Sequence, residues 1–113
     1  MRLTLAPDDF GGMVCTAGHD GLEAVIAAAD ASQAAGALWT AVEQLAEFGT
    51  SECYWPAETG AYRWVFRRVD LEVRIAILWS TGTLTGWEHV FSAECDGADF
   101  LRQAREQLTT VSI

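Results

Sequence analysis

Histidine and cysteine are the residues of this sequence whose side chains are best suited to chemistry. The chain has two histidines, at positions 19 and 89, and three cysteines, at positions 15, 53 and 95. A thiol and an imidazole can form a nucleophile and its base, but this chemistry also needs a residue that orients the base and an oxyanion hole. No motif in the sequence supplies either one. We therefore expect a protein without catalytic activity.

The same side chains do not have the spacing of a metal site. Zinc sites usually contain two pairs of closely spaced ligands. Here Cys15 and His19 are the one close pair, and the other ligands would have to come from Cys53, Cys95 or His89. The sequence also lacks a phosphate-binding glycine loop, a nucleophile elbow, an HExxH motif and an EF-hand loop. We therefore expect neither a metal nor a cofactor.

His89 is the single residue with the most interesting surroundings, because it lies between Trp87 and Phe91 in an alternating apolar segment. A buried imidazole can act as a general base or bind a ligand, although it is more often a core residue with a hydrogen-bond partner. This gives an alternative function, a small-molecule-binding protein or small enzyme with an aromatic pocket between helices and sheet. That pocket would be lined by His89, Cys95, Trp64 and Trp87.

The charge distribution excludes some partners and favours others. The formal net charge is −9, and residues 1–60 contain nine acidic residues and one base, Arg2. Because cations that displace counterions provide most of the affinity for nucleic acids and anionic lipids, we expect no binding to DNA, RNA or membranes. A basic protein would instead be attracted to this chain.

The acidic residues also predict where such a partner would bind. Glu43 and Glu47 are four residues apart on a predicted helix, so they lie on the same side of it, with no basic residue spaced to neutralise them. Farther along, two more glutamates flank an aromatic residue that could anchor a contact. The predicted partner surface is therefore Glu43, Glu47, Glu52, Trp55 and Glu58. In the alternative interpretation the acids only keep the surface solvated, and Trp55 folds back onto the core.

The elements that position these residues divide into a helical half and a sheet half. Residues 2–6 alternate in polarity and predict an edge strand. A first helix is predicted after Asp20, because Asp20 and Glu23 have the spacing of a capping box. A second helix is predicted from Ser32 to a glycine stop at Gly49. A third helix begins near residue 96.

Between the second and third helices the apolar period changes to two, which predicts three antiparallel strands. Trp64 and His89 are predicted to lie opposite Ile75 from either side, with a turn at residues 81–83. Trp87 then shares their buried face, and arginines and glutamates occupy the other face.

These elements predict a single α+β domain over residues 1–113. The expected architecture has two layers, with an antiparallel β-meander of three to four strands and helices packed on one face, in the order β-α-α-β-β-β-α. The absence of a signal-like or membrane-spanning segment and the three unpaired cysteines predict a cytoplasmic protein. The absence of lysine and the abundance of alanine are typical of a bacterial chain.

Together these features favour a small acidic non-enzymatic domain that docks onto a basic protein. An immunity or antitoxin-like inhibitor and an accessory subunit are both compatible with this prediction. A homodimer formed through the edge strand or the polar sheet face is also compatible with it.

Overall fold

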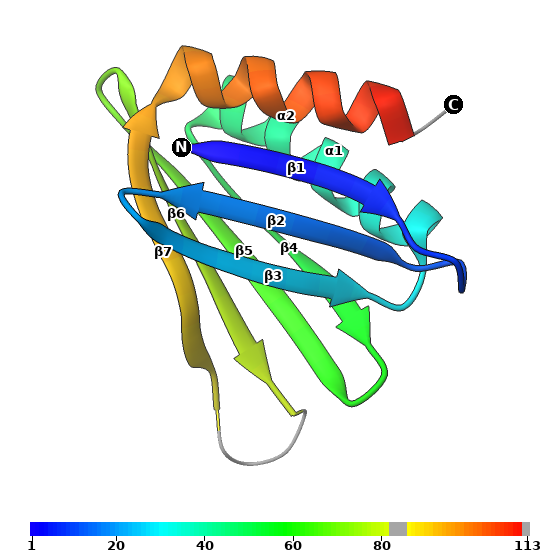
Figure 1. Ribbon diagram of the computed structural model, residues 1–113. Coiled ribbons are helices and arrows are strands. Elements are labelled where there is room, and N and C mark those ends of the chain that lie inside the picture. Colours follow the sequence, from blue (N-terminus) through cyan, green and yellow to red (C-terminus); the bar gives the residue numbers. More distant parts are fainter. Residues whose placement is uncertain (82–85, 112–113) are drawn as a thin grey trace.

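Two antiparallel sheets and two helices form the part of the chain that the computed structural model describes, residues 1–81 and 86–111 (Figure 1). Strands β1 to β3 form the first sheet and strands β4 to β7 the second, each in sequence order. The predicted α+β class with antiparallel strands is therefore confirmed. The elements are β1 (Arg2–Pro7), β2 (Met13–His19), β3 (Leu22–Ala28), α1 (Ala31–Phe48), β4 (Thr50–Ala57), β5 (Gly60–Val69), β6 (Glu72–Ser80), β7 (Glu88–Asp96) and α2 (Gly97–Val111).

The predicted first helix is instead strand β3. Asp20 and Gly21 both have left-handed backbone angles, with φ of 49° and 80°, and they join β2 to β3 so that Leu22 pairs with His19. Asp-Gly is a preferred sequence for a two-residue hairpin turn in which both residues have positive φ. Asp20 is therefore a turn residue and not a helix cap. The observed order is β-β-β-α-β-β-β-β-α, which corrects the predicted order and replaces one sheet and three helices with two sheets and two helices.

The predicted second helix is confirmed as α1, and both of its ends are capped. The Asp30 carboxylate accepts the N–H of Gln33 at 2.9 Å, which is the usual role of an N-cap residue. Gly49 follows the helix with a φ of 80° and donates its N–H to the Leu45 carbonyl, as a C-terminal glycine commonly does.

Strands β5 and β6 of the four-stranded sheet have the predicted faces but not the predicted pairing. Trp64 of β5 lies opposite Ile77 of β6 rather than opposite Ile75. The turn between these strands is formed by Asp70, whose φ is 55°, and Leu71. A change of two residues in the pairing leaves every side chain on its original face, so the buried face was predicted correctly for β5 and β6.

The predicted orientation of His89 is wrong because strand β7 contains a β-bulge. Ile77 pairs with Phe91, and the next residue, Leu78, pairs with His89, so Val90 is an extra residue. An extra residue in one strand reverses the alternation beyond it. Phe91 faces the core, whereas His89 is exposed. Residues 82 and 83 of the predicted turn lie outside the described residues.

The core lies between the two sheets and the two helices. Helices α1 and α2 run side by side (Figure 1). Helix α2 also covers the edge of the first sheet, since the backbone N–H groups of Leu3 and Leu5 donate to the side-chain oxygens of Gln103 and Gln107. This contact closes an edge that could otherwise pair with another strand. Neither described helix is long and apolar enough to cross a membrane.

Candidate functional site

Trp55, the predicted aromatic anchor of the partner surface, is part of the core. It has no exposed surface, its indole N–H donates to the Ala34 carbonyl at 3.1 Å, and its ring centroid lies 5.0 Å from that of Trp64. The prediction of an exposed anchor is therefore wrong, and the alternative, in which Trp55 folds back onto the core, is confirmed for this side chain. Because side chains alternate between the two faces along strand β4, the neighbouring Tyr54 side chain lies on the other face and is 44% exposed.

Two of the four predicted surface glutamates already have a cation within the molecule. Both carboxylate oxygens of Glu43 accept hydrogen bonds from Arg105 of α2, at 3.0 Å each. Glu52 accepts two hydrogen bonds from Arg63 on the neighbouring strand, at 3.0 and 2.5 Å. In each case the hydrogen bond from the arginine lowers the pKa of the glutamate carboxyl group. The expectation that these carboxylates are uncompensated is therefore wrong.

The other two predicted glutamates, Glu47 and Glu58, are exposed but lie at opposite ends of α1. Glu47 is in the last turn of this 18-residue helix, which is roughly 27 Å long. Glu58 follows β4 close to the start of the helix, where the Ala29 N–H donates to the Pro56 carbonyl. The predicted residues therefore do not form one continuous surface.

The four residues of the alternative ligand pocket also lie apart. Trp64 is completely buried, whereas His89 and Trp87 are exposed. Cys95 is partly buried, and its sulfur lies 3.9 Å from the sulfur of Met1. The predicted pocket with His89 as its polar group is not formed by this arrangement.

The buried thiols are poorly suited to chemistry. Burial raises the pKa of both Cys15 and Cys53 to about 12, and the Glu52 charge adds to the effect at Cys53. Since the thiolate is the reactive form, these two side chains act as small apolar residues of the core. Within residues 1–81 and 86–111, no three side chains of the types that bind metals come together.

An aromatic cluster on the outer face of the second sheet contains Trp87, which is 41% exposed. The Arg63 guanidinium carbon lies 6.0 Å from the ring centroid of Tyr54 and 5.9 Å from that of Trp87, and Glu52 holds the same guanidinium. We call Tyr54, Arg63, Trp87 and Glu52 the outer cluster. Its cation lies against two rings and one carboxylate, and the carboxylate balances its charge and accepts two of its five N–H groups.

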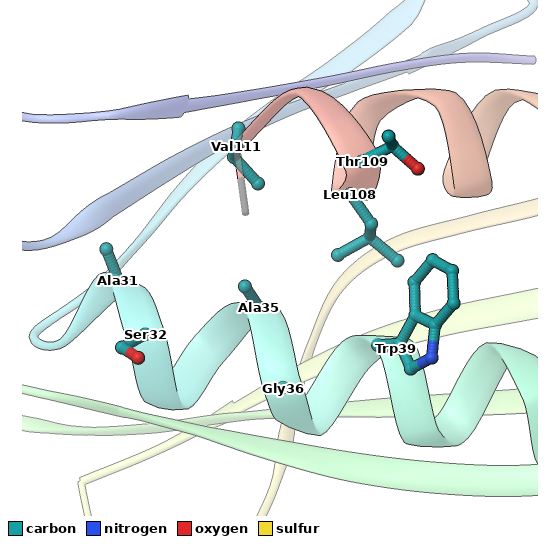
Figure 2. A pocket seen from close by; sticks show the side chains of 8 residues that line it. All are labelled: Ala31, Ser32, Ala35, Gly36, Trp39, Leu108, Thr109 and Val111. Atoms are coloured by element: carbon teal, nitrogen blue, oxygen red, sulfur yellow. The ribbon is translucent and has the colours of Figure 1, made fainter. Parts of the chain in front are cut away.

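A groove of about 780 Å³ runs between α1 and α2 (Figure 2). Small residues of α1 lie along it, Trp39 stands at one end, and the end of α2 forms the opposite wall. Its polar side-chain groups are the hydroxyls of Ser32 and Thr109 and the indole N–H of Trp39, and none of the described residues that line it is titratable. Such a groove can receive an apolar group. The lining residues are Ala31, Ser32, Ala35, Gly36, Trp39, Leu108, Thr109 and Val111.

A smaller depression of about 350 Å³ has a different character, and we call it the acidic cleft. Its only charged lining residues are Asp8 and Glu58, and none of its lining residues is basic. Aromatic rings from three segments also line it. The complete lining comprises Asp8, Phe10, Gly12, Ala27, Ala28, Ala29, Ala57, Glu58, Thr59, Tyr62 and Trp79.

Three chain connections form the acidic cleft, and backbone hydrogen bonds hold them at one end of the molecule (Figure 1). In the β1–β2 loop, the Asp8 carboxylate accepts the N–H groups of Phe10 and Gly12, each at 2.8 Å. The loop is joined to the start of α1 by the Ala31 N–H, which donates to the Gly11 carbonyl at 2.8 Å. The hydrogen bond from the Ala29 N–H to the Pro56 carbonyl brings the β4–β5 turn beside this loop and the start of α1.

The wall of the cleft is an aromatic pair at the end of the buried face of the second sheet. Tyr62 and Trp79 are cross-strand neighbours, and their ring centroids are 4.7 Å apart. The Trp79 ring lies over Gly60, where a β-carbon would be only 2.8 Å from it. Both rings are partly buried, so each can contribute to the core and still contact a group in the cleft.

Four carboxylates surround this end of the molecule. Asp8 and Glu58 line the cleft, Asp9 is the next residue of the loop, and Asp30 caps α1 beside Gly11. No ion pair to these four acids occurs among residues 1–81 and 86–111. Phe10, at the rim, is 94% exposed.

Of these residues, only Glu58 belongs to the partner surface predicted from the sequence. The segment from Asp8 to Gly12 contains a signal for part of this end, because one phenylalanine lies between two acids and two glycines. A large apolar residue in a polar turn has no neighbouring element to cover it.

The chain was compared with protein-family models, with curated proteins and with solved structures, and none of the three comparisons found a match.

Proposed function

We propose that the protein is a small acidic, non-enzymatic binding protein that docks onto a basic surface of another protein through the end that carries the acidic cleft. The observation that supports this proposal is the combination, at one end, of four carboxylates that form no ion pair among the described residues and a phenylalanine that is 94% exposed. Uncompensated charges accelerate encounter with a complementary partner. Exposed aromatic side chains are enriched where interfaces form.

The proposed mechanism is occlusion of a cationic site on the partner. Phe10 takes the role of contact residue that the sequence assigned to Trp55, and Glu58 keeps its predicted role. Glu43 and Glu52 contribute little, because Arg105 and Arg63 already neutralise them. An immunity or antitoxin-like inhibitor and an accessory subunit would both act in this way. In this proposal the protein acts in the cytoplasm, where its three free thiols would remain reduced.

The test compares two double charge reversals that change the net charge equally. Asp9→Lys with Glu58→Lys changes the proposed docking end, whereas Glu47→Lys with Glu72→Lys changes exposed acids elsewhere. Each protein is used to capture partners from an extract of the native host. The captured protein is identified by mass spectrometry, purified, and titrated calorimetrically from about 0.05 M to about 0.5 M salt.

The expected partner is a basic protein that binds wild type and the control variant. The variant at the docking end should bind it at least about tenfold more weakly, and the wild-type affinity should fall steeply with salt. Equal loss of affinity in both variants, or an affinity that does not respond to salt, would contradict the proposal.

A further inference from the structure

We infer that the acidic cleft binds one arginine side chain of the partner, with the guanidinium against the Tyr62 and Trp79 rings and hydrogen-bonded to Glu58. This inference rests on the proposed function, because it specifies the basic group that the docking end would recognise. It is carried by a comparison between two sites of the same molecule, the outer cluster and the acidic cleft.

The outer cluster shows how this chain holds a guanidinium. A tyrosine and a tryptophan lie about equally far from the Arg63 guanidinium carbon, and a glutamate accepts its N–H groups. Both rings are partly exposed, so the arrangement forms at a surface accessible to water. The recognition elements are therefore one tyrosine, one tryptophan and one glutamate.

The acidic cleft brings together the same three residue types without a cation among its lining residues. Tyr62 and Trp79 are in contact, at 4.7 Å between centroids, and Glu58 lines the same depression. Asp8 adds a second carboxylate, with one oxygen held by two backbone N–H groups. A cation near an aromatic face is attracted to its π-electrons, and the two carboxylates that line the cleft favour the same charge.

The size of the cleft suits one long side chain. Its volume of about 350 Å³ is at the lower end of the range for small-ligand pockets, about 300 to 1,000 Å³. The alanines at positions 27–29 and 57 provide apolar surface for methylene groups, and Asp8 and Glu58 line the same cleft and can meet a charged end. A helix or a folded segment would not enter a depression of this size.

Arginine fits these groups better than lysine does. A guanidinium is planar, stacks on aromatic rings and can bond a carboxylate through two N–H groups, whereas an ammonium is a compact and strongly hydrated charge.

The test uses three short probe peptides, acetyl-Gly-X-Gly-amide, in which X is arginine, lysine or citrulline. Citrulline has nearly the shape of arginine but no charge. Binding is followed by NMR through the indole N–H resonance of Trp79, assigned with Trp79→Phe, at low salt and millimolar peptide. Glu58→Gln tests the carboxylate, and Glu47→Gln is the matched control because Glu47 is exposed and lies at the far end of α1.

The arginine peptide should shift the Trp79 resonance in a saturable way, and the citrulline peptide should not. Glu58→Gln should weaken binding by roughly tenfold or more, as expected for a lost charge-assisted hydrogen bond, while Glu47→Gln should leave it unchanged. Equal binding of the citrulline or lysine peptide would overturn the inference, as would a shift confined to Trp87.

The two proposals fail in different experiments. Charge-dependent capture of a basic partner combined with no binding of the arginine peptide would retain the docking function and reject the arginine site. Binding of the arginine peptide at Trp79 with no charge-dependent capture of a basic partner would retain the site and reject the docking function.

Discussion

At the scale of single residues, contacts with arginine decide which carboxylates remain available to a partner. Glu43 meets Arg105 and Glu52 meets Arg63, whereas Glu58 has no such contact among the described residues. Exposed ion pairs of this kind usually stabilise a protein by no more than about 1 kcal/mol. A carboxylate that already accepts two arginine hydrogen bonds also attracts a second cation less, so Glu43 and Glu52 are weaker candidates than Glu58 for the proposed docking surface.

The buried cysteines give a residue-scale prediction about pH. The ordinary thiol pKa of 9.0 is raised to about 12 in folded Cys15, so the unfolded chain loses this proton first as the pH rises. The free energy of unfolding should therefore fall as the pH rises from about 9 towards 12, by at most about 1.4 kcal/mol per pH unit for this thiol. Cys15→Ala removes this contribution and should make the decrease shallower.

Urea unfolding of both proteins at several pH values between about 8 and 11 measures the effect. The difference in stability between wild type and Cys15→Ala should shrink with rising pH, since other groups titrate alike in both proteins. A difference that stays constant over this range would show that the Cys15 thiol is not shielded from ionisation.

At the scale of elements, two glycines in different backbone conformations should respond oppositely to the same substitution. Gly21 lies in the β2–β3 turn with a φ of 80°, and a β-carbon there would meet nothing within 4 Å. Gly21→Ala should destabilise the protein by about 1 kcal/mol, because a left-handed conformation is unfavourable for alanine. Gly36 lies within α1, where a β-carbon also meets nothing, so Gly36→Ala should stabilise by up to about 1 kcal/mol.

Thermal or urea unfolding of the two variants tests this pair directly. Since neither substitution creates a steric contact, the sign of each change reports the backbone conformation alone. A stabilising Gly21→Ala would mean that residues 20 and 21 do not form the hairpin turn.

At the scale of the whole molecule, the net charge of −9 should oppose folding at low salt through repulsion between like charges. Asp9→Asn combined with Glu58→Gln removes two charges from the end that carries the acidic cleft. This double variant should be more stable than wild type by up to about 0.5 kcal/mol at low salt. The gain should disappear at about 0.5 M salt, where charges are screened.

The same urea titration with Glu43→Gln is the control, because this change breaks the pair with Arg105 and should give no gain. A gain that persists at high salt would point to a cause other than charge. If the prediction holds, the docking end is a region where the molecule sacrifices some stability for an acidic surface.

The local features of the fold could be predicted from the sequence wherever a single short signal was present. Helix α1 has an apolar stripe and a glycine after it, and it begins at Ala31, one residue before the predicted start at Ser32. The buried faces of β5 and β6 follow from their alternation, which a shift of two residues does not change. The hairpin at residues 20 and 21 was missed because Asp-Gly and a capping box compete for the same aspartate, and the choice between them depends on pairing with β2.

The sequence by itself determined the acidic character of the chain, its α+β class, and the apolar faces of α1, β5 and β6, because each depends on composition or on neighbours a few residues apart. Only the tertiary structure decided which acids remain unpaired, which tryptophans are buried and which side chains share a cleft. Arg105 neutralises Glu43 across 62 positions of sequence, and the bulge at Val90 turns His89 outward. Loops near residues 10, 30 and 58 meet because backbone hydrogen bonds join them. Contacts of this range depend on how sheets and helices pack, and no local pattern encodes that packing.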